Sequence, residues 1–567
     1  MYTAKKLFVA LPIATFAFVE AWANESVNFV KRSWDNVNKR VVDTDTSITD
    51  YVELDGSNKN GTYTLESGKW YVVKKSFLRN EIIAPLGDAA NLLVFDGATL
   101  SSRIIIDKDH SLNIFGQSGD SGKIIAEGYS KTTHSEDAFH YQYYTATSRA
   151  AIGSGGDMGT LVIHGGTITA TSYVAAGIGG GGYKSSTEKP VTGKGGDVTI
   201  YGGTVTARGG TGGAGIGGCY DDGGVLTIYG GKVTATSGGL HTAGIGGGNG
   251  HKDYGYTFRS GGGVVNIYGG SVVARGSEYA AGIGGGENGS GGTVTIWGGN
   301  VKAYGGADGA GIGSGEQLDD KINGGTVTIY GGYVEAHGGD FGAGIGGGQD
   351  ASGATVVIYN GTVAAFGGDD AAGIGSGEEY VSGPINGGSL TVYGGDVFAD
   401  GTGWGAGIGA GQDADGAVVE IYGGKVVAWA GENAGKKNGS AIGSAASEGH
   451  YGKLYIADSL KVKAGQSAYN ISLFPFETRV PACRWRPYAR IEQVSLVDKV
   501  NIDAEVGNSL KKSTTSGDAR IQEGRLDAVG SIGRHVDHWY DLQGRKLNGR
   551  PTDQGKYLHN GRVEIVR

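Results

Sequence analysis

The chain has 567 residues, 113 of them glycine and 8 proline, and a formal net charge of −9. A mildly acidic chain is a poor partner for a nucleic-acid backbone, and the lack of a strict Gly-X-Y period excludes collagen. Val and Ile recur at regular positions, which argues against disorder. The two cysteines, Cys219 and Cys483, form no disulfide framework and stand too many repeats apart to pair.

Residues 1–23 have the features of a secretory signal peptide. Lys5 and Lys6 precede an apolar run at residues 7–19 that is too short to span a bilayer, and residues 21–23 form an A-x-A cleavage site. We therefore expect a secreted protein with no transmembrane segment after removal of the signal.

Residues 24–60 lack the repeat that fills most of the chain, and we predict that they cover its N-terminal end, because open strand edges need protection. Residues 92–100 (LLVFDGATL) and 112–116 (LNIFG) match the repeat weakly, with Phe95 and Phe115 at its aromatic position. The repeat array is predicted to occupy residues 61–465.

Ten copies of the phrase A-G-I-G, or a close variant, follow one another at a period of roughly 30 residues. Their isoleucines are Ile152, Ile178, Ile216, Ile245, Ile283, Ile312, Ile345, Ile374, Ile408 and Ile442. A second phrase, typified by VTIYGGTVTA at residues 198–207, lies between them. A fixed period of this length indicates a stacked repeat architecture.

One repeat, residues 281–312, divides into three short extended pieces separated by glycine pairs. In the middle piece Val294 and Ile296 alternate with Thr293, Thr295 and Trp297, which is the period-two pattern of a strand. Three strands and three turns make one coil, so the sequence predicts an all-β parallel β-helix of roughly a dozen three-strand coils. The corner after A-G-I-G carries the insertions, the longest at residues 183–195 and 249–261.

The C-terminal part divides into four predicted segments. Residues 453–464 are a degenerate last copy of the repeat, and residues 466–495 are the C-terminal cap. Residues 496–535 lack the repeat and form a linker, and residues 536–567 form a separate small β unit.

The first column of equivalent residues is aromatic and is predicted to point outward. It contains His164, Tyr201, Tyr229, Tyr268, Trp297, Tyr330, Tyr359, Tyr393 and Tyr422. Rings that repeat about 4.8 Å apart either stack on one another and stabilise the coil, or form a platform for the apolar faces of sugars. We take the tyrosines and Trp297 as ligand-binding candidates.

The second column lies seven residues after the first and is mixed in chemistry. It contains Thr171, Arg208, Thr236, Arg275, Tyr304, His337, Phe366, Asp400 and Trp429. Mixed usage is typical of ordinary exposed surface. If a chain binds here, Tyr304, Phe366 and Trp429 are the expected contacts.

The third column follows each isoleucine by four residues and is rich in carboxylates and amides. The candidates for a metal site in and beside it are Glu287, Glu316, Glu378, Asp350 and Asp413. Oxygen-rich loops on neighbouring coils suit Ca²⁺, whereas hydrophilic turns are the alternative. Neither an EF-hand loop nor a G-G-x-G-x-D repeat occurs, and no other cofactor is indicated.

The glycines of A-G-I-G allow two interpretations. Either they leave the outer face of their strand bare, so that a flat polymer can approach the backbone, or they adopt a positive φ in turns.

Catalytic signatures are sparse. The sequence has no H-E-x-x-H, G-x-S-x-G or C-x-x-C motif, and its Asp pairs fall at different repeat positions. A polysaccharide lyase or glycoside hydrolase of the pectinase type therefore stays an alternative to a binding protein.

The phrases A-G-I-G-G-G and T-I-Y-G-G-x-V-x-A, with the opening at residues 61–73 (GTYTLESGKWYVV), resemble bacterial surface glycine-rich repeat proteins of the carbohydrate-binding-domain-containing kind. The resemblance covers about residues 60–465. It implies a right-handed parallel β-helix and a polysaccharide-binding or adhesive role.

The tail contains WYDLQGR at residues 539–545 and GKYLHNGRV at residues 555–563, and is similar to type IX-like C-terminal sorting domains. That similarity implies export across, or display on, the outer membrane. The expected protein is thus a secreted or surface-displayed, non-catalytic β-helix of a bacterium that binds polysaccharide or acts as an adhesin. A structural spacer is the third possibility.

Overall fold

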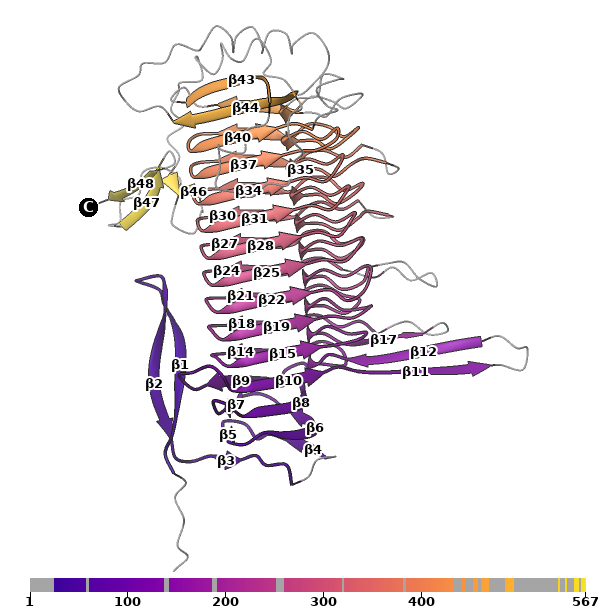
Figure 1. Cartoon of the computed structure of the whole chain (residues 1–567), viewed down its shortest axis with the longest axis vertical. Coiled ribbons are helices and arrows are strands. Elements are labelled where there is room, and N and C mark those ends of the chain that lie inside the picture. Colours follow the sequence, from indigo (N-terminus) through magenta and orange to yellow (C-terminus); the bar gives the residue numbers. More distant parts are fainter. Residues whose placement is uncertain are drawn as a thin grey trace, which may run out of the picture.

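The computed structural model is a stack of coils, each with three short strands and three turns (Figure 1). It describes residues 25–57, 61–136, 142–185, 191–250, 258, 260–318, 321–380, 384–431, 441–443, 452–456, 460–468, 485–493, 539–540, 546–547, 555–559 and 562–566. Every regular element in these ranges is a strand. The predicted signal peptide and linker lie outside them.

Sheet A contains the two-residue strands of the Ile-Gly phrase. These are β13 (Ile152–Gly153), β16 (Ile178–Gly179), β20 (Ile216–Gly217), β23 (Ile245–Gly246), β26 (Ile283–Gly284), β29 (Ile312–Gly313), β32 (Ile345–Gly346), β35 (Ile374–Gly375), β38 (Ile408–Gly409) and β41 (Ile442–Gly443). Neighbouring strands pair in parallel with Ile opposite Ile.

Sheet B has 14 parallel strands, and most of them have four residues. In spatial order they are β3 (Val52–Glu53), β5 (Trp70–Val73), β7 (Ala90–Val94), β9 (Ser111–Gly116), β14 (Thr160–Ile163), β18 (Asp197–Ile200), β21 (Val225–Ile228), β24 (Val264–Ile267), β27 (Thr293–Ile296), β30 (Thr326–Ile329), β33 (Thr355–Ile358), β36 (Ser389–Val392), β39 (Val418–Ile421) and β42 (Lys453–Ile456).

Sheet C contains the strand that follows each Gly-Gly turn. Its parallel strands are β4 (Thr62–Thr64), β6 (Phe77–Ile83), β8 (Thr99–Ile105), β10 (Lys123–Glu127), β15 (Thr167–Thr171), β19 (Thr204–Arg208), β22 (Lys232–Thr236), β25 (Ser271–Arg275), β28 (Asn300–Tyr304), β31 (Tyr333–His337), β34 (Thr362–Phe366), β37 (Asp396–Asp400) and β40 (Lys425–Trp429). The long strand β8 also pairs with β13, so it joins sheet C to sheet A.

The core is a column of small and branched side chains inside the coil. Alternation predicts Val294 and Ile296 inside, and both are at most 1% exposed. Val301, Ala303 and Ile312 of the same coil are fully buried. Identical residues on neighbouring coils meet at the strand spacing, so each coil buries the core of the next. The predicted parallel β-helix is confirmed.

The weak first copies lie in sheet B, but one predicted register is wrong. Phe115 pairs with His164 in the aromatic column, as expected. On the preceding strand, however, the partner of Phe115 is Leu93 and not Phe95, which lies two residues further on. The sequence gives no local signal for this shift, because both residues are apolar.

The last copy of the repeat also departs from prediction. β42 continues sheet B, but sheet C ends in two antiparallel strands, β43 (Leu460–Ala468) and β44 (Trp485–Gln493). β44 pairs with β40 and so closes the edge of the sheet. Only β42 therefore continues the parallel repeat expected for residues 453–464, because β44 takes the next place in sheet C.

Three further groups of strands lie outside the coils. β1 (Val27–Asp35) and β2 (Arg40–Ile48) form an antiparallel hairpin that runs along the coils and not across their end (Figure 1). β11 (Tyr129–Glu136), β12 (Gln142–Arg149) and β17 (Gly182–Ser185) form a three-stranded antiparallel sheet. β45 (Trp539–Tyr540), β46 (Lys546–Leu547), β47 (Gly555–His559) and β48 (Arg562–Val566) form a four-stranded sheet in the tail.

Cys219 is buried and free, and burial raises the pKa of its thiol. Cys483 lies outside the described residues. These residues include no helix of the length and hydropathy needed to cross a membrane.

Candidate functional site

The aromatic column stands at the end of each sheet B strand, immediately before the turn into sheet C. Ile329 points into the core and is fully buried, so alternation turns the next residue, Tyr330, outward, where it is half-buried. The same reasoning holds on each coil, and the predicted outward position is confirmed.

The rings of this column stack face to face on one another. Phe115 and His164 have ring centroids 4.3 Å apart, and the column then continues without a break to Tyr422. The closest pair, Trp297 and Tyr330, lies 4.0 Å apart with an interplanar angle of 8°. Burial raises the pKa of Tyr201 and Tyr229 in the column.

This stacking decides which part of each ring a ligand can reach. The faces of each ring inside the column lie against its neighbours, and only the edges with their hydroxyl or N–H groups point outward. A sugar cannot lie on a face that is already covered. Ligand binding by Tyr201, Tyr229, Tyr268, Trp297, Tyr330, Tyr359 and Tyr393 stays a prediction, now restricted to ring edges. It also stays a prediction for Tyr422, the last ring of the described column, which is 43% exposed and to which the restriction does not extend.

Sheet B presents an uncharged outer surface beside this column over four of its strands. Its strands bring two further outward residues per coil, such as Thr326 and Thr328 before Tyr330. We define the open face as the eight outward residues of β27, β30, β33 and β36 together with the ring residue that follows each strand, twelve residues in all. They are Thr293, Thr295, Trp297, Thr326, Thr328, Tyr330, Thr355, Val357, Tyr359, Ser389, Thr391 and Tyr393. None is charged, and they repeat about every 4.8 Å between strands and about 6.7 Å along them.

A groove follows the turns at the edge of this surface. We call the two-residue turns between sheets B and C the turn row. On its last coils an open groove of about 490 Å³ is lined by Asn360, Gly361, Thr362, Gly395, Asp396, Gly424 and Lys425. The second turn residue has a positive φ, for example 85° at Gly395, which explains the glycine at that position.

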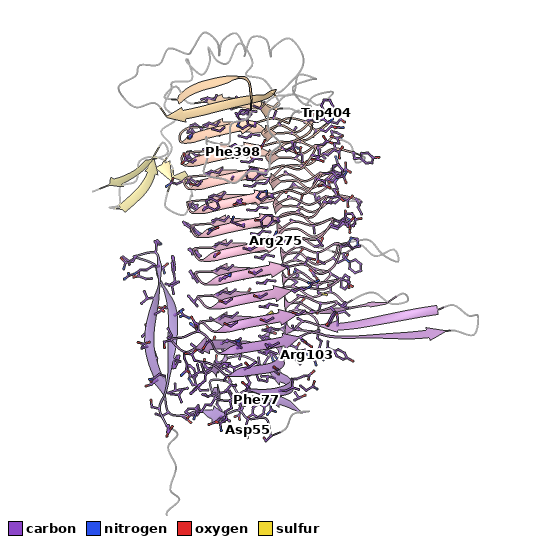
Figure 2. All side chains as sticks on the ribbon, in the orientation of Figure 1. Asp55, Phe77, Arg103, Arg275, Phe398 and Trp404 are labelled. Carbon is purple, nitrogen blue, oxygen red and sulfur yellow. The ribbon has the colours of Figure 1, made fainter. Side chains whose placement is uncertain are left out.

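The second column lies on sheet C in the predicted register. Arg275 covers one face of Tyr304 at 3.9 Å, and His337 stacks on Tyr304 at 5.1 Å. Phe366 continues the stack at 4.6 Å from His337. Arg275 and Phe398 are labelled on this sheet in Figure 2. Ring faces are therefore occupied here too, and a ligand would meet Tyr304 only at its edge.

The expectation that Trp429 is an exposed contact residue is wrong. Its side chain is 2% exposed and packs in an apolar cluster with Phe398 and Val427. Alternation gives the side of the sheet correctly, but an outward residue is exposed only if nothing packs over it.

Glu335 forms a compact ionic group on the outer side of sheet C. Its carboxylate accepts hydrogen bonds from Lys302 Nζ at 2.8 Å, Tyr333 Oη at 2.8 Å and His337 Nε2 at 2.9 Å. Burial opposes the charge, but these donors, Lys302 foremost, lower the pKa of Glu335 to about 2. The ionised carboxylate of Glu335 therefore fixes the side chains of Lys302, Tyr333 and His337 at neutral pH.

The third column forms a row of carboxyl groups at the corner after sheet A. Burial and, after it, neighbouring carboxylates raise the pKa of Glu316 to about 8 and of Glu378 to about 7. The same causes raise the pKa of Asp308, on an adjacent loop, to about 6. Glu287 is 1% exposed, and its carboxylate lies against Nδ1 of His241. We call Glu287, Asp308, Glu316, Asp350 and Glu378 the carboxyl row.

The backbone of this corner keeps the row in register. Asn288 N donates to Glu316 O at 2.8 Å, and Asp350 N donates to Glu378 O at 2.7 Å. Asp350 and Asp413 have positive φ values, and Asp350 Oδ1 accepts a hydrogen bond from Tyr380 N on the next coil. Asp350 thus stabilises a left-handed turn, which is a common use of Asp and Asn.

The described residues contain no group of three or more His, Cys, Asp or Glu side chains placed to hold a metal ion. Ca²⁺ also accepts amide and backbone oxygens, so calcium binding by Glu287, Glu316, Glu378, Asp350 and Asp413 stays a prediction.

The glycines of the Ile-Gly strands are buried and have positive φ, for example 147° at Gly313. A Cβ there would lie 1.8 Å from the carbonyl oxygen of Gly346 on the next coil. The positive φ is confirmed for the glycine after each Ile, but this glycine lies in the two-residue strand and not in a turn, and the glycine before Ile, such as Gly311, has no positive φ. The strand is buried and offers no open backbone surface.

Sequence reasoning missed the contact between the hairpin and the aromatic column. Trp34 lies 5.0 Å from the Tyr229 ring and 5.2 Å from the Tyr268 ring. Arg32 donates to His164 O at 2.7 Å and pairs with Asp120. The only sequence signal was an alternating strand with Arg32 and Trp34 on one face, which does not say where that face docks.

Comparison with known proteins agrees with this geometry. Seven segments match the model of the beta helix repeat family, at residues 161–182, 198–220, 226–249, 265–287, 294–316, 327–349 and 356–378. The chain therefore contains beta helix repeats, and they coincide with coils of the parallel β-helix. No curated protein and no solved structure matches the chain significantly.

Proposed function

We propose that this protein is a non-catalytic β-helix that binds an extended, uncharged polysaccharide along the open face and the neighbouring turn row. The observation that carries the proposal is the open face itself, four consecutive strands with the ring residue after each, whose twelve outward residues include no charge. Charged residues stand further along the same sheet on both sides. The position of Thr328 is occupied by Glu420 on β39, and the position of Thr326 is occupied by Asp197 on β18.

The chemistry of such a surface suits a neutral sugar chain. Threonine and tyrosine offer a hydroxyl group beside an apolar surface, and a sugar ring offers the same pair of features. Binding a neutral chain on the open face removes water from no charged side chain, which is the costly step at charged surfaces. Each coil repeats the same contacts, so weak interactions along one chain add up.

The groove supplies polar groups at the edge of this surface. Asn360 and Thr362 lie on one coil, Asp396 on the next and Lys425 on the one after it, at the end of the groove. These side chains can hydrogen-bond to sugar hydroxyls while the ring edges of Tyr359 and Tyr393 contact the apolar part of the chain.

We further propose that the protein is exported and displayed on the cell surface, where it acts as an adhesin for the polysaccharide. The signal-like residues 1–23 and the sorting-like tail support this. Accessibility of the protein on intact cells to added protease would test it, and full protection would contradict it.

Retention on insoluble glycans tests binding. Wild type and a Tyr330→Ala plus Tyr359→Ala variant are incubated with cellulose, chitin and xylan, after circular dichroism has shown that both are folded. We expect retention of wild type and weaker retention of the variant, because two ring edges are lost. Equal retention would reject a role for the column.

A structural spacer is the second candidate, and the face-to-face stacking of the rings favours it. A spacer needs only the stiffness that a continuous ring stack gives. It predicts that wild type is retained on none of the glycans, so the same experiment separates the two functions.

Cleavage of polysaccharide is the third candidate, favoured by the raised pKa values of Asp308, Glu316 and Glu378. A carboxyl that stays protonated near neutral pH is what a general acid requires. Release of reducing ends or unsaturated products from the same glycans would support an enzyme, and loss of that release in Glu316→Gln would assign it to the row.

A further inference from the structure

The β1–β2 hairpin covers part of the same ring column and turn row that the proposed function uses. Its strands pair from Val27 opposite Ile48 to Asp35 opposite Arg40, and it runs along the coils (Figure 1). It packs at three places, an apolar base, a middle in the turn row and a tip, and they differ in how firmly they hold it.

The base of the hairpin is anchored in an apolar cluster. The Phe29 ring lies 4.6 Å from Trp70 and 5.1 Å from Phe115. Val27 and Phe29 are 4% and 3% exposed. This end of the hairpin is part of the packed structure of the first coils.

The middle of the hairpin lies in the turn row. Arg32 reaches across the turns of two coils, because a Cβ added to Gly165 or Gly202 would meet its side chain at 2.4 and 2.6 Å. On the next coil a Cβ at Gly230 would meet Val41 at 3.2 Å. The side chains of the hairpin fill the channel that these glycines leave open.

The tip rests on the ring column through Trp34, and residues 36–40 at its end are open to water. The Trp34 indole contacts Tyr229 and Tyr268, while Val37 at the end of the hairpin is 87% exposed. Most of β2 is half-buried or exposed. Segments with few buried contacts open at a lower free energy than the core.

The equivalent turns of later coils are not filled by side chains. A Cβ added to Gly298, Gly331 or Gly394 would meet only the backbone of the ring residue one coil before. The hairpin and the groove of about 490 Å³ thus occupy the same repeat position on different coils.

We propose that the hairpin is a displaceable cover, and that the rings and turns from His164 to Tyr268 beneath it are a second length of the polysaccharide site. This inference rests on the proposed function. The hairpin takes the place of ligand on these coils, with Arg32 and Val41 in the turn row and Trp34 on the ring edges. A long sugar chain that displaces the tip gains contact with up to four more coils.

Trp34→Ala tests the cover in the full chain, because it removes the tip contact and leaves the coils unchanged. The matched control is Val37→Ala, which removes an apolar side chain of the same hairpin that is exposed. Two quantities are measured for each protein: hydrogen exchange of the backbone amides, and retardation in native gels that contain hydroxyethylcellulose or soluble xylan.

We expect the amides of β1 beyond Phe29 and of β2 to exchange about 10- to 100-fold faster in Trp34→Ala, with the strands of sheet B unchanged. Retardation by polysaccharide should correspond to an association constant at least about threefold higher than that of wild type. Val37→Ala should match wild type in both. In wild type itself, saturating polysaccharide should speed exchange of the tip.

Two results would overturn the cover. One is exchange of the tip as slow as that of β27 and β30 even in Trp34→Ala. The other is a freed tip with unchanged polysaccharide binding. If neither protein is retarded, the proposed function fails instead, and the exchange data alone decide whether the hairpin opens.

Discussion

The ring column and the carboxyl row show opposite consequences of the same repeat. Both place like residues on successive coils at the strand spacing, and the backbone ladder fixes both. Stacked rings attract one another, so the column from Phe115 to Tyr422 stabilises the coil. Stacked carboxylates repel one another and lose water, so burial and like charge raise the pKa of Glu316 and Glu378.

A repeat therefore places the same interaction on every coil, so an attraction between like side chains and a repulsion between like side chains both accumulate along the stack. Glu335, on the outer side of sheet C, accepts hydrogen bonds from three different residues, and its pKa is lowered to about 2. A carboxylate is therefore tolerated where a coil supplies donors. In the row, the charged neighbours of Asp308 and Glu316 are other carboxylates.

Breaking the coil spacing should destroy both columns at once, and this is the largest effect we expect. In Gly313→Ala the new methyl group would overlap the carbonyl oxygen of Gly346, at a φ of 147°. We expect a loss of more than about 4 kcal/mol or failure to fold, measured by urea unfolding. Gly156→Ala is the control, since a Cβ there meets nothing within 4 Å. Equal stability of the two variants would contradict the tight coil contact.

Removing one ring should weaken the attractive column alone. Tyr330 stacks at 4.0 Å on Trp297 and at 4.8 Å on Tyr359, so Tyr330→Ala interrupts the stack on both sides. We expect a loss of about 2–3 kcal/mol in the free energy of unfolding, and less than about 1 kcal/mol for Tyr330→Phe, which keeps the ring. If both variants lose the same amount, the hydroxyl group and not the stack is the stabilising feature.

The repulsive row should make stability depend on pH. Glu316 has its pKa raised from 4.5 to about 8 in the folded chain. Between these values the folded state holds more protons than the unfolded state, so the free energy of unfolding falls as pH rises. The contribution of protonated Glu316 to the free energy of unfolding is complete below pH 4.5, and it is lost as the pH rises through the pKa of Glu316 in the folded chain. Glu335, with a pKa lowered to about 2, acts in the opposite direction and only below pH 4.5.

We expect the melting midpoint to fall by at least about 2 °C between pH 5 and pH 8, by differential scanning calorimetry. Glu316→Gln removes one titrating group and should reduce this fall while leaving the midpoint at pH 5 nearly unchanged. A midpoint that rises over the same interval would contradict the assignment of the row.

The sequence predicted the coil well, because each strand repeats a local pattern. Each copy shows the alternation seen around Ile329 and an aromatic residue at the position of Tyr330. The strands, the inward residues and the columns could therefore be predicted from this local pattern. Contacts between distant segments left no such signal. Arg32 meets Asp120 and His164, 88 and 132 residues away, and β44 inserts beside β40 in antiparallel orientation.

The site was predicted only as far as the side of the sheet on which each residue lies. Ring orientation depends on side-chain torsions, so the choice between a stacked column and a sugar platform needed coordinates. Trp429 lies on the predicted side but is covered. Asp350 resembled a metal ligand in the sequence, yet its carboxylate accepts a backbone hydrogen bond in a left-handed turn.

The claim on which the proposed function depends is that the uncharged open face contacts the polysaccharide. Placing two lysines there, Thr328→Lys plus Val357→Lys, tests it against a control pair on the outer side of sheet C, Thr206→Lys plus Thr234→Lys. Retention on insoluble glycans should fall at least about fivefold for the first pair and stay at the wild-type value for the second. Equal retention of the two variants and wild type would contradict the account.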